Sequence, residues 1–153
     1  MANLRWTVTL QSVPCSITGA LTLMQIVAPT NQKVVIDRIM ISGQSNLNTD
    51  TPVALEILEQ TTAGTATNTT VAPVKANVLD TETVQTNTQN TFTVEPTAGL
   101  SHFARNIHPQ GSYDFNFPPG REIVLGGGKK LAIRQPVAAV QASKFTITVE
   151  GRE

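Results

Sequence analysis

Apolar and polar side chains alternate along this chain with a period of two residues, and this alternation constrains the fold more than any other feature. Three segments show it most clearly: residues 6–10, 112–117 and 144–150. Successive side chains of a β-strand point to opposite faces, so each segment predicts a strand with one buried and one hydrated face. A helical period is not sustained anywhere. Residues 137–143 would form one helical turn at most, because Pro136 precedes them and the run is short.

Further short apolar runs fill the rest of the chain. Residues 33–42 are apolar at nearly every position, which predicts a central strand covered on both faces or packed at a subunit contact. Other runs lie at residues 21–27 and near Val53, Phe92, Ile123 and Leu131. Turn residues at 118–120 and 126–128 separate successive runs. We therefore expect roughly eight to ten strands.

The length of 153 residues suits one core, so residues 1–153 are predicted to form a single domain. Many short strands separated by turns indicate an all-β fold, an antiparallel β-sandwich with jelly-roll topology as the leading arrangement. The spacing of the runs is uneven and shows no fixed repeat. A propeller or a solenoid is therefore not expected.

One long connection stands out, at residues 59–91. It begins EQTTAGTATNTTVAPVKANV and joins the predicted strand near Leu55 to the one near Phe92. A loop of this length is usually functional or disordered. Neither flank is long enough to form its own core, so it does not link two domains. The Asn68-Thr69-Thr70 sequon would suit a glycosylated stalk, but the N-terminus has no pattern of a secretion signal.

Apolar residues recur through this connection, and they are too many for a freely hydrated tether. They are Val71, Val74, Val78, Leu79 and Val84. Ordering a chain segment costs roughly 1 to 2 kcal/mol per residue, which burial against another surface can offset. We therefore predict an extended Thr-rich arm that orders against a neighbouring protomer or another protein.

The charge balance excludes several classes of partner. Lysine plus arginine and aspartate plus glutamate each number 11, so the formal net charge is zero, and 14% of the residues are charged. No long-range field favours direct binding of nucleic acid or of a membrane surface. No apolar run approaches the roughly 20 residues of a bilayer-spanning helix. We expect synthesis in a cytoplasm, without membrane association, and a surface suited to packing into an assembly.

Candidate reactive residues do not form a site in the sequence. Cys15 is the single cysteine, which excludes an intrachain disulfide, and we interpret it as a small buried side chain. His102 and His108 have no clustered third ligand, so we predict no metal site. The GGGKK run at residues 126–130 lacks the following Ser or Thr and the helix of a phosphate loop, and is interpreted as a turn. We predict no catalytic residue, no cofactor and no enzyme activity.

Interface residues are predicted from their apolar or aromatic character. Trp6 and Tyr113 would stack on a sugar, but aromatic side chains more often anchor a core or an interface, and only 5% of the chain is aromatic. The predicted interface set is Trp6, Val71, Val74, Val78, Leu79 and Tyr113.

Four segments in a fixed order carry a family resemblance: APTNQKVVIDRIMIS, LEILEQTTAGTATNTTVAPV, FNFPPGREIVLGGGKKLAIRQ and TITVEGRE. Together they resemble the jelly-roll capsid cement, or decoration, proteins of tailed bacteriophages. The resemblance covers residues 27–153, with the Thr-rich stretch before Pro73 as its most distinctive part. The residues before Val27 match only as generic strands, and Tyr113 stands where a tryptophan is expected.

The resemblance implies a structural role. A cement protein would form a homotrimer, bind the major capsid protein on the outer surface of the shell, and reside on the virion exterior after synthesis in the host cytoplasm. The resemblance implies no catalytic residue in this chain. The alternative is a carbohydrate- or receptor-binding jelly-roll module of a phage fibre, which aromatic-rich loops would favour. A third class, a cupin-like metalloenzyme, would require clustered histidines.

Overall fold

The computed structural model describes residues 4–45, 49–69 and 71–153. Within these residues the chain forms twelve strands and no helix, so residues 137–143 do not form the helical turn that their sequence allowed. The strands are β1 (Arg5–Pro14), β2 (Leu21–Val27), β3 (Val34–Gly43), β4 (Val53–Gln60), β5 (Thr65–Thr69), β6 (Val74–Lys75), β7 (Asn87–Val94), β8 (Ala98–Ile107), β9 (Ser112–Asn116), β10 (Ile123–Leu125), β11 (Lys130–Gln135) and β12 (Lys144–Arg152).

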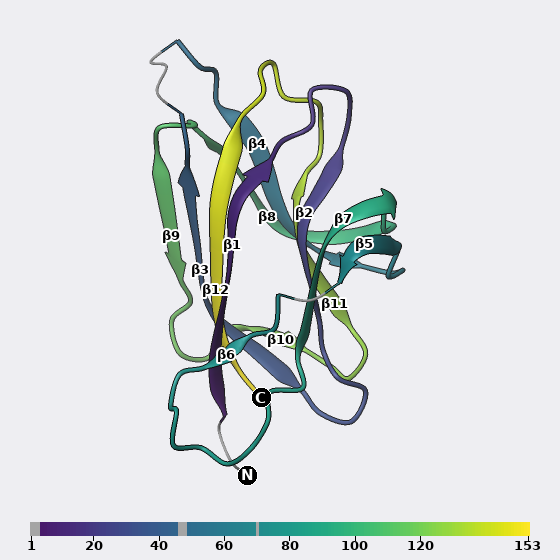
Figure 1. Ribbon diagram of the computed structural model, residues 1–153, viewed down its shortest axis with the longest axis vertical. Helices are drawn as coiled ribbons and strands as arrows, with labels where there is room; N and C mark the ends of the chain where they lie inside the picture. The colour runs from purple at the N-terminus through teal and green to yellow at the C-terminus, as the bar shows by residue number, and fades with distance from the viewer. Residues whose placement is uncertain (1–3, 46–48, 70) are drawn as a thin grey trace.

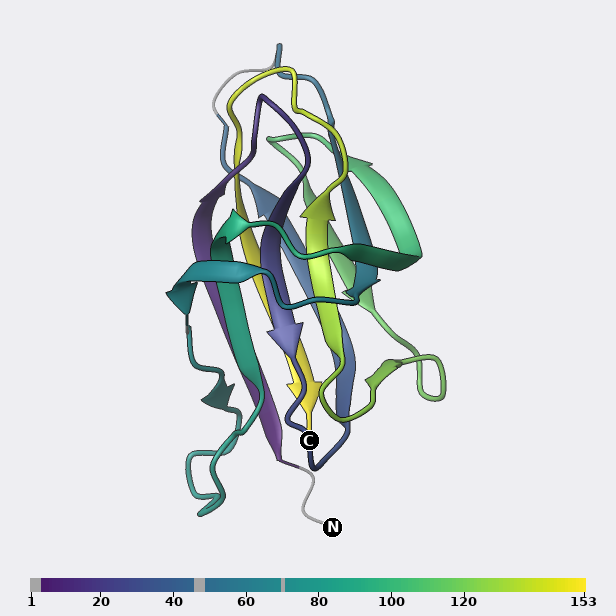
Figure 2. The ribbon, with the colours of Figure 1, turned by 90° about the vertical axis from the view of Figure 1, so that its right-hand side faces the viewer.

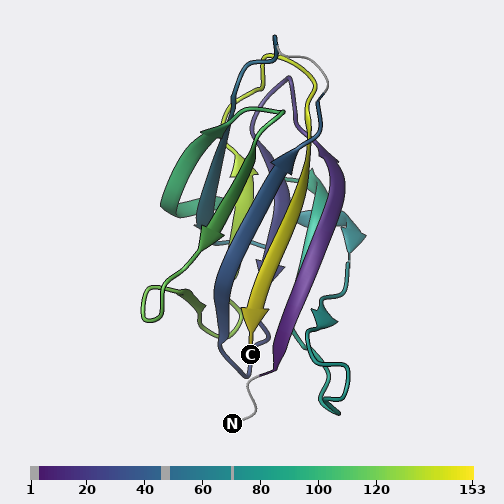
Figure 3. The ribbon, with the colours of Figure 1, turned by 90° about the vertical axis from the view of Figure 1, so that its left-hand side faces the viewer.

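These strands form two antiparallel sheets that pack face to face (Figure 1). Sheet A has the order β10-β3-β12-β1-β6, and β9 pairs with β3 on the same edge as β10 (Figure 3). Sheet B has the order β5-β7-β2-β11-β4-β8 (Figure 2). The predicted all-β antiparallel sandwich is confirmed.

The strand pairs are nested from the ends of the chain inward. β1 pairs with β12, β2 with β11, β3 with β9 and β10, and β4 with β8. Such nesting is what a long hairpin gives when it is rolled into two layers. It supports the jelly-roll topology, which stays a prediction.

The core lies between the two sheets and is built by the alternating strands. Trp6, Val8 and Leu10 of β1 are 1 to 5% exposed, and Phe145, Ile147 and Val149 of β12 are fully buried. The intervening threonines lie on the outer face, where Thr9 Oγ1 and Thr148 Oγ1 are 2.9 Å apart. The inside and outside faces of these two strands are therefore as predicted.

The long strand β3 lies inside sheet A, with β12 on one side and β9 and β10 on the other. Its inward residues, Ile36 and Ile39 among them, are buried, whereas Val35 and Met40 on the outer face are only half-buried. The central position is as predicted. Full cover of both faces is not observed.

The predicted arm, residues 59–91, is not free of its own domain. β5 pairs with β7 at the edge of sheet B, β6 pairs with β1 at the edge of sheet A, and β7 returns to pair with β2. The segment thus finds open strand edges on its own chain, which corrects the expectation that only another molecule orders it. Thr70, the last residue of the sequon, lies outside the described residues.

The first part of this segment also covers the outer face of sheet B (Figure 2). Beneath it, Gln25 Nε2 donates to Gln60 Oε1 at 2.7 Å, and Gln60 Nε2 donates to Thr22 Oγ1 at 2.9 Å. All three side chains are buried. Gln25 Nε2 also lies 3.5 Å from the carbonyl oxygen of Thr62, whereas Gln25 Oε1 has no hydrogen-bond partner among the described residues. The start of the Thr-rich segment thus contributes to the layer that covers these buried amides.

Candidate functional site

The two histidines lie in different settings. His102 Nε2 is 3.8 Å from Glu59 Oε1, and His108 Nδ1 accepts a hydrogen bond of 3.1 Å from the backbone N–H of Gln110. Among the residues that the structure describes, no group of three or more His, Cys, Asp or Glu side chains is placed to hold a metal ion.

The GGGKK run forms the turn between β10 and β11, as predicted. The N–H of Gly128 donates to the connection between β2 and β3, with the nitrogen 3.2 Å from the carbonyl oxygen of Ala28 and 3.1 Å from that of Pro29. Lys130 Nζ donates to the carbonyl oxygen of Gly128. The Gly128 N–H and the Lys130 ammonium group therefore already have carbonyl partners within the chain.

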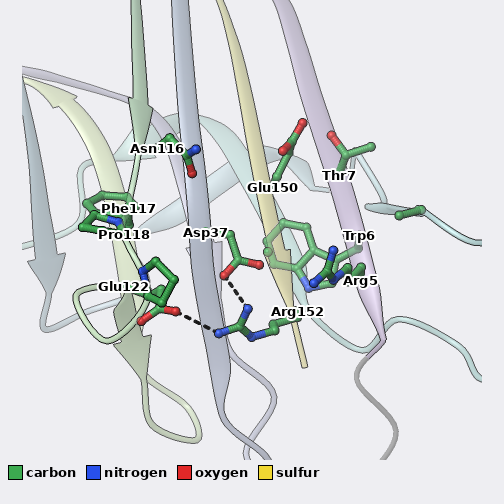
Figure 4. A pocket seen from close by; sticks show the side chains of 13 residues that line it. Arg5, Trp6, Thr7, Asp37, Asn116, Phe117, Pro118, Glu122, Glu150 and Arg152 are labelled. Atoms are coloured by element: carbon green, nitrogen blue, oxygen red, sulfur yellow. Dashed lines mark hydrogen bonds and ion pairs between the residues drawn. The ribbon is translucent and has the colours of Figure 1, made fainter.

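A cavity of about 540 Å³ lies over one end of sheet A (Figure 4). Residues of β1, β3 and β12 line it together with the loop between β9 and β10. Arg152 is at its centre: Nη1 lies 2.9 Å from Asp37 Oδ1, and Nη2 lies 3.1 Å from Glu122 Oε1. The ion pair with Glu122 ties the β9–β10 loop to β12, and the ion pair with Asp37 joins β12 to β3. Sequence reasoning did not find this cluster, because its members come from three distant parts of the chain.

The two carboxylates in this cavity differ in environment. Burial raises the pKa of Asp37, although the nearby cations Arg152 and Arg5 act in the opposite direction. Hydrogen bonds from its own backbone N–H and from that of Gly120 lower the pKa of Glu122, with a smaller contribution from Arg152. Both carboxylates face the same guanidinium. The arrangement therefore suits structural bridging between β3, β12 and the β9–β10 loop.

Trp6 borders the same cavity but is 1% exposed, and its Nε1 has no hydrogen-bond partner among the described residues. A side chain this buried belongs to the core of the chain and presents no area to a partner. This corrects the prediction of Trp6 as an interface residue. The alternating pattern of β1 had already placed it on the apolar face of the strand.

Tyr113 belongs to an aromatic cluster that fills the open side between β8 and β9. Phe103 of β8 stacks on Phe115 of β9 with ring centroids 4.1 Å apart, and Phe115 also contacts Tyr113 and Phe117. The guanidinium of Arg105 lies 5.6 Å from the centre of the Tyr113 ring. Tyr113 is half-buried in this cluster. Its role toward a partner stays a prediction.

Four of the five valine and leucine residues of the arm remain exposed although the arm is docked, whereas Val84 packs against the core. Val71 is 37%, Val74 65%, Val78 87% and Leu79 88% exposed. Val78 and Leu79, the two most exposed of these residues, are neighbours on one turn, residues 77–80, which we call the tip.

Hydrogen bonds within the arm order the tip. Asn77 Oδ1 accepts from the backbone N–H of Leu79 at 3.1 Å, and Asn77 Nδ2 donates to Asp80 Oδ1 at 2.9 Å. Lys75 Nζ donates to the carbonyl oxygen of Asp80 at 2.6 Å. An asparagine that binds its own backbone two residues on is a known turn signal, so Asn77 could have been identified from the sequence.

A second group of exposed aliphatic residues lies on the loops between β1 and β2 and between β11 and β12. It consists of Ile17 at 59%, Val137 at 60% and Val140 at 82% exposed. The two loops touch through a hydrogen bond from Ala139 N–H to the Ser16 carbonyl oxygen. They lie at the end of the sandwich opposite the strand ends that flank the tip (Figure 1).

No protein-family model matches this chain, and no curated protein or solved structure shows significant similarity to it. In the part of the chain that the structure describes, there is no helix long and apolar enough to cross a bilayer.

Proposed function

We propose that this chain is a viral structural protein, a cement protein that binds the major capsid protein on the outer surface of a phage shell and stabilises it. The observation that carries the proposal is the tip. Its two aliphatic side chains, Val78 and Leu79, are 87 and 88% exposed on an ordered turn, so in the isolated chain they gain no free energy from burial. Burying each against a partner is worth about 1.5 to 3 kcal/mol.

The order of the tip strengthens this argument. A turn that is fixed before binding loses little conformational entropy when it meets a partner. The hydrogen bonds of Asn77 and Lys75 provide that order. An exposed apolar pair on a rigid turn is therefore suited to fill a small apolar depression on another protein. The proposed role is structural, with no enzyme activity and no cofactor.

The charge of the chain also fits a contact within an assembly. With a formal net charge of zero, the proposed binding to the shell depends on apolar and hydrogen-bonded contacts rather than on long-range attraction. A homotrimer would present three tips to the shell at once. Linked sites can raise apparent affinity by roughly 10² to 10⁴ without a new kind of contact.

Cosedimentation with intact virus particles tests the proposal. We expect the wild-type protein to bind in a fixed ratio to the shell protein, and the Val78→Ser/Leu79→Ser variant to bind at least about tenfold more weakly. The matched control is Val137→Ser/Val140→Ser, which changes two exposed valines at the opposite end of the sandwich and should bind normally. Absence of wild-type binding contradicts the cement function. Equal loss in both variants contradicts the role of the tip.

The cavity over sheet A favours an alternative, a carbohydrate- or receptor-binding module of a phage fibre. Its lining of arginine, carboxylate, asparagine and threonine side chains suits a hydroxylated ligand, which both donates and accepts hydrogen bonds. Trp6 offers no exposed ring for stacking on a sugar. Screening the protein against a panel of glycans, with Arg152→Ala as the comparison, separates this function from cement binding.

A further inference from the structure

The tip belongs to a longer segment, residues 76–86, which connects β6 to β7 and which we call the strap. It leaves the edge of sheet A after Lys75 and returns to sheet B at Asn87, passing the end of β12 on the way (Figure 1). Most of its residues are exposed. What holds it against the sandwich therefore decides where the tip points.

The returning half of the strap is bound by a single carboxylate. The backbone N–H of Gln85 donates to Glu153 Oε1 at 2.6 Å. The backbone N–H and the hydroxyl of Thr86 donate to Glu153 Oε2 at 2.9 and 2.5 Å. The N–H of Ala76, at the start of the strap, donates to the Arg5 carbonyl oxygen at 2.8 Å. For the rest of the strap, residues 77–86, every hydrogen bond in the described structure to a residue outside the strap and β6 ends on the two Glu153 oxygens. Val84 adds an apolar contact with the core.

Glu153 is itself fixed to sheet A. Its backbone N–H donates to the Leu4 carbonyl oxygen, and its carbonyl oxygen accepts from the Leu4 N–H, each at 3.1 Å. These two bonds continue the antiparallel pairing of β1 with β12 by one further pair. The carboxylate is thus a defined point on the sandwich to which the strap is attached.

A carboxylate fits this position better than any neutral group. All three partners are donors, and an ionised carboxylate accepts several hydrogen bonds, each stronger than a neutral one. Thr86 is 3% exposed, so water cannot readily replace the lost acceptor. A glutamine at residue 153 would direct its own amide donor at one of these donors and leave it unpaired.

We infer that Glu153 is a latch that holds the strap closed against the sandwich and thereby fixes the direction of the tip. When this carboxylate is lost, the strap opens locally while the sheets remain folded. The effect of the latch on tip presentation rests on the proposed function. The attachment of the strap to Glu153 does not, and it can be measured on the protein alone.

Amide hydrogen exchange on the free protein tests the latch in Glu153→Gln. We expect the amides of Gln85 and Thr86 to exchange at least about tenfold faster, while amides of β12 such as Ile147 keep their rates. Glu82→Gln is the matched control, because it removes a strap carboxylate that is exposed and has no hydrogen bond in the described structure. It should leave the exchange of both amides unchanged.

A second variant keeps the test decisive if Glu153→Gln perturbs the whole fold. Thr86→Val preserves shape and removes only the hydroxyl donor to Oε2, so the Thr86 amide should exchange several-fold faster in an otherwise folded protein. Unchanged exchange at Gln85 and Thr86 in every folded variant overturns the latch. Cosedimentation is read separately: wild-type protein that does not bind particles contradicts the cement function and leaves the exchange result standing.

Discussion

Phe145 and Thr146 are neighbours in sequence on opposite faces of β12. Phe145 is fully buried, whereas Thr146 lies on the outer face and its hydroxyl accepts a hydrogen bond from Gln44 Nε2. We predict that Phe145→Ala lowers the free energy of unfolding by about 3 to 5 kcal/mol, because it removes a large core side chain. Thr146→Ala should cost less than about 1 kcal/mol. Equal shifts of the urea midpoint would show that the faces are assigned wrongly.

Cys15 is a buried thiol at the end of the core, and burial raises its pKa from 9.0 to about 11. We predict that a thiol reagent at pH 8 labels it only after unfolding, because the thiolate is the reactive form. Because the thiol has a higher pKa in the folded state than in the unfolded state, it contributes stability at a pH below its unfolded-state pKa. This stability is lost as the pH rises through its folded-state pKa. The stability difference between wild type and Cys15→Ala should therefore shrink between pH 8 and pH 11. Fast labelling of the native protein contradicts this.

At the scale of elements, the turn between β10 and β11 offers a matched pair of glycines. A Cβ at Gly127 would lie 2.3 Å from the Thr30 carbonyl oxygen, whereas one at Gly126 would meet only Lys129 Cγ, at 3.9 Å. We predict that Gly127→Ala costs about 2 kcal/mol or more, since backbone must move. Gly126→Ala should stay within about 0.5 kcal/mol of wild type. Thermal unfolding of both variants checks this, and equal melting temperatures would be inconsistent with the close approach.

The elements that sequence reasoning placed well are those with a regular period. β9 and β12 alternate over their whole length and β1 alternates as far as Leu10, and burial of one face follows from that pattern alone. β5 and β6 were not placed, because they are short and depend on the open edges of β7 and β1 rather than on their own residues. The arm therefore looked irregular in sequence although it pairs on both sheets.

The candidate site was accessible to sequence reasoning only in part. Val78 and Leu79 were identified because apolar residues are unexpected in a long polar connection. The latch connects Glu153 to Gln85 and Thr86, which lie 68 and 67 positions earlier in the chain. The cluster around Arg152 spans β3, β12 and a loop. These long-range hydrogen bonds and ion pairs depend on which strands become neighbours, and local sequence patterns do not encode that.

At the scale of the whole molecule, the proposed assembly makes a prediction about oligomeric state and salt. A chain with no net charge cannot depend on long-range attraction, so each contact with the shell should be modest and the number of contacts should supply the strength. We predict a homotrimer at micromolar concentration, measured by light scattering after size exclusion. Because salt screens exposed charges and leaves apolar contacts intact, capsid binding should change little between low salt and about 0.5 M salt. A strictly monomeric protein, or release from particles by moderate salt, would contradict this prediction. The Val78→Ser/Leu79→Ser variant then locates the tip: if this variant still forms a trimer but no longer binds particles, the tip contacts the shell and not a neighbouring protomer.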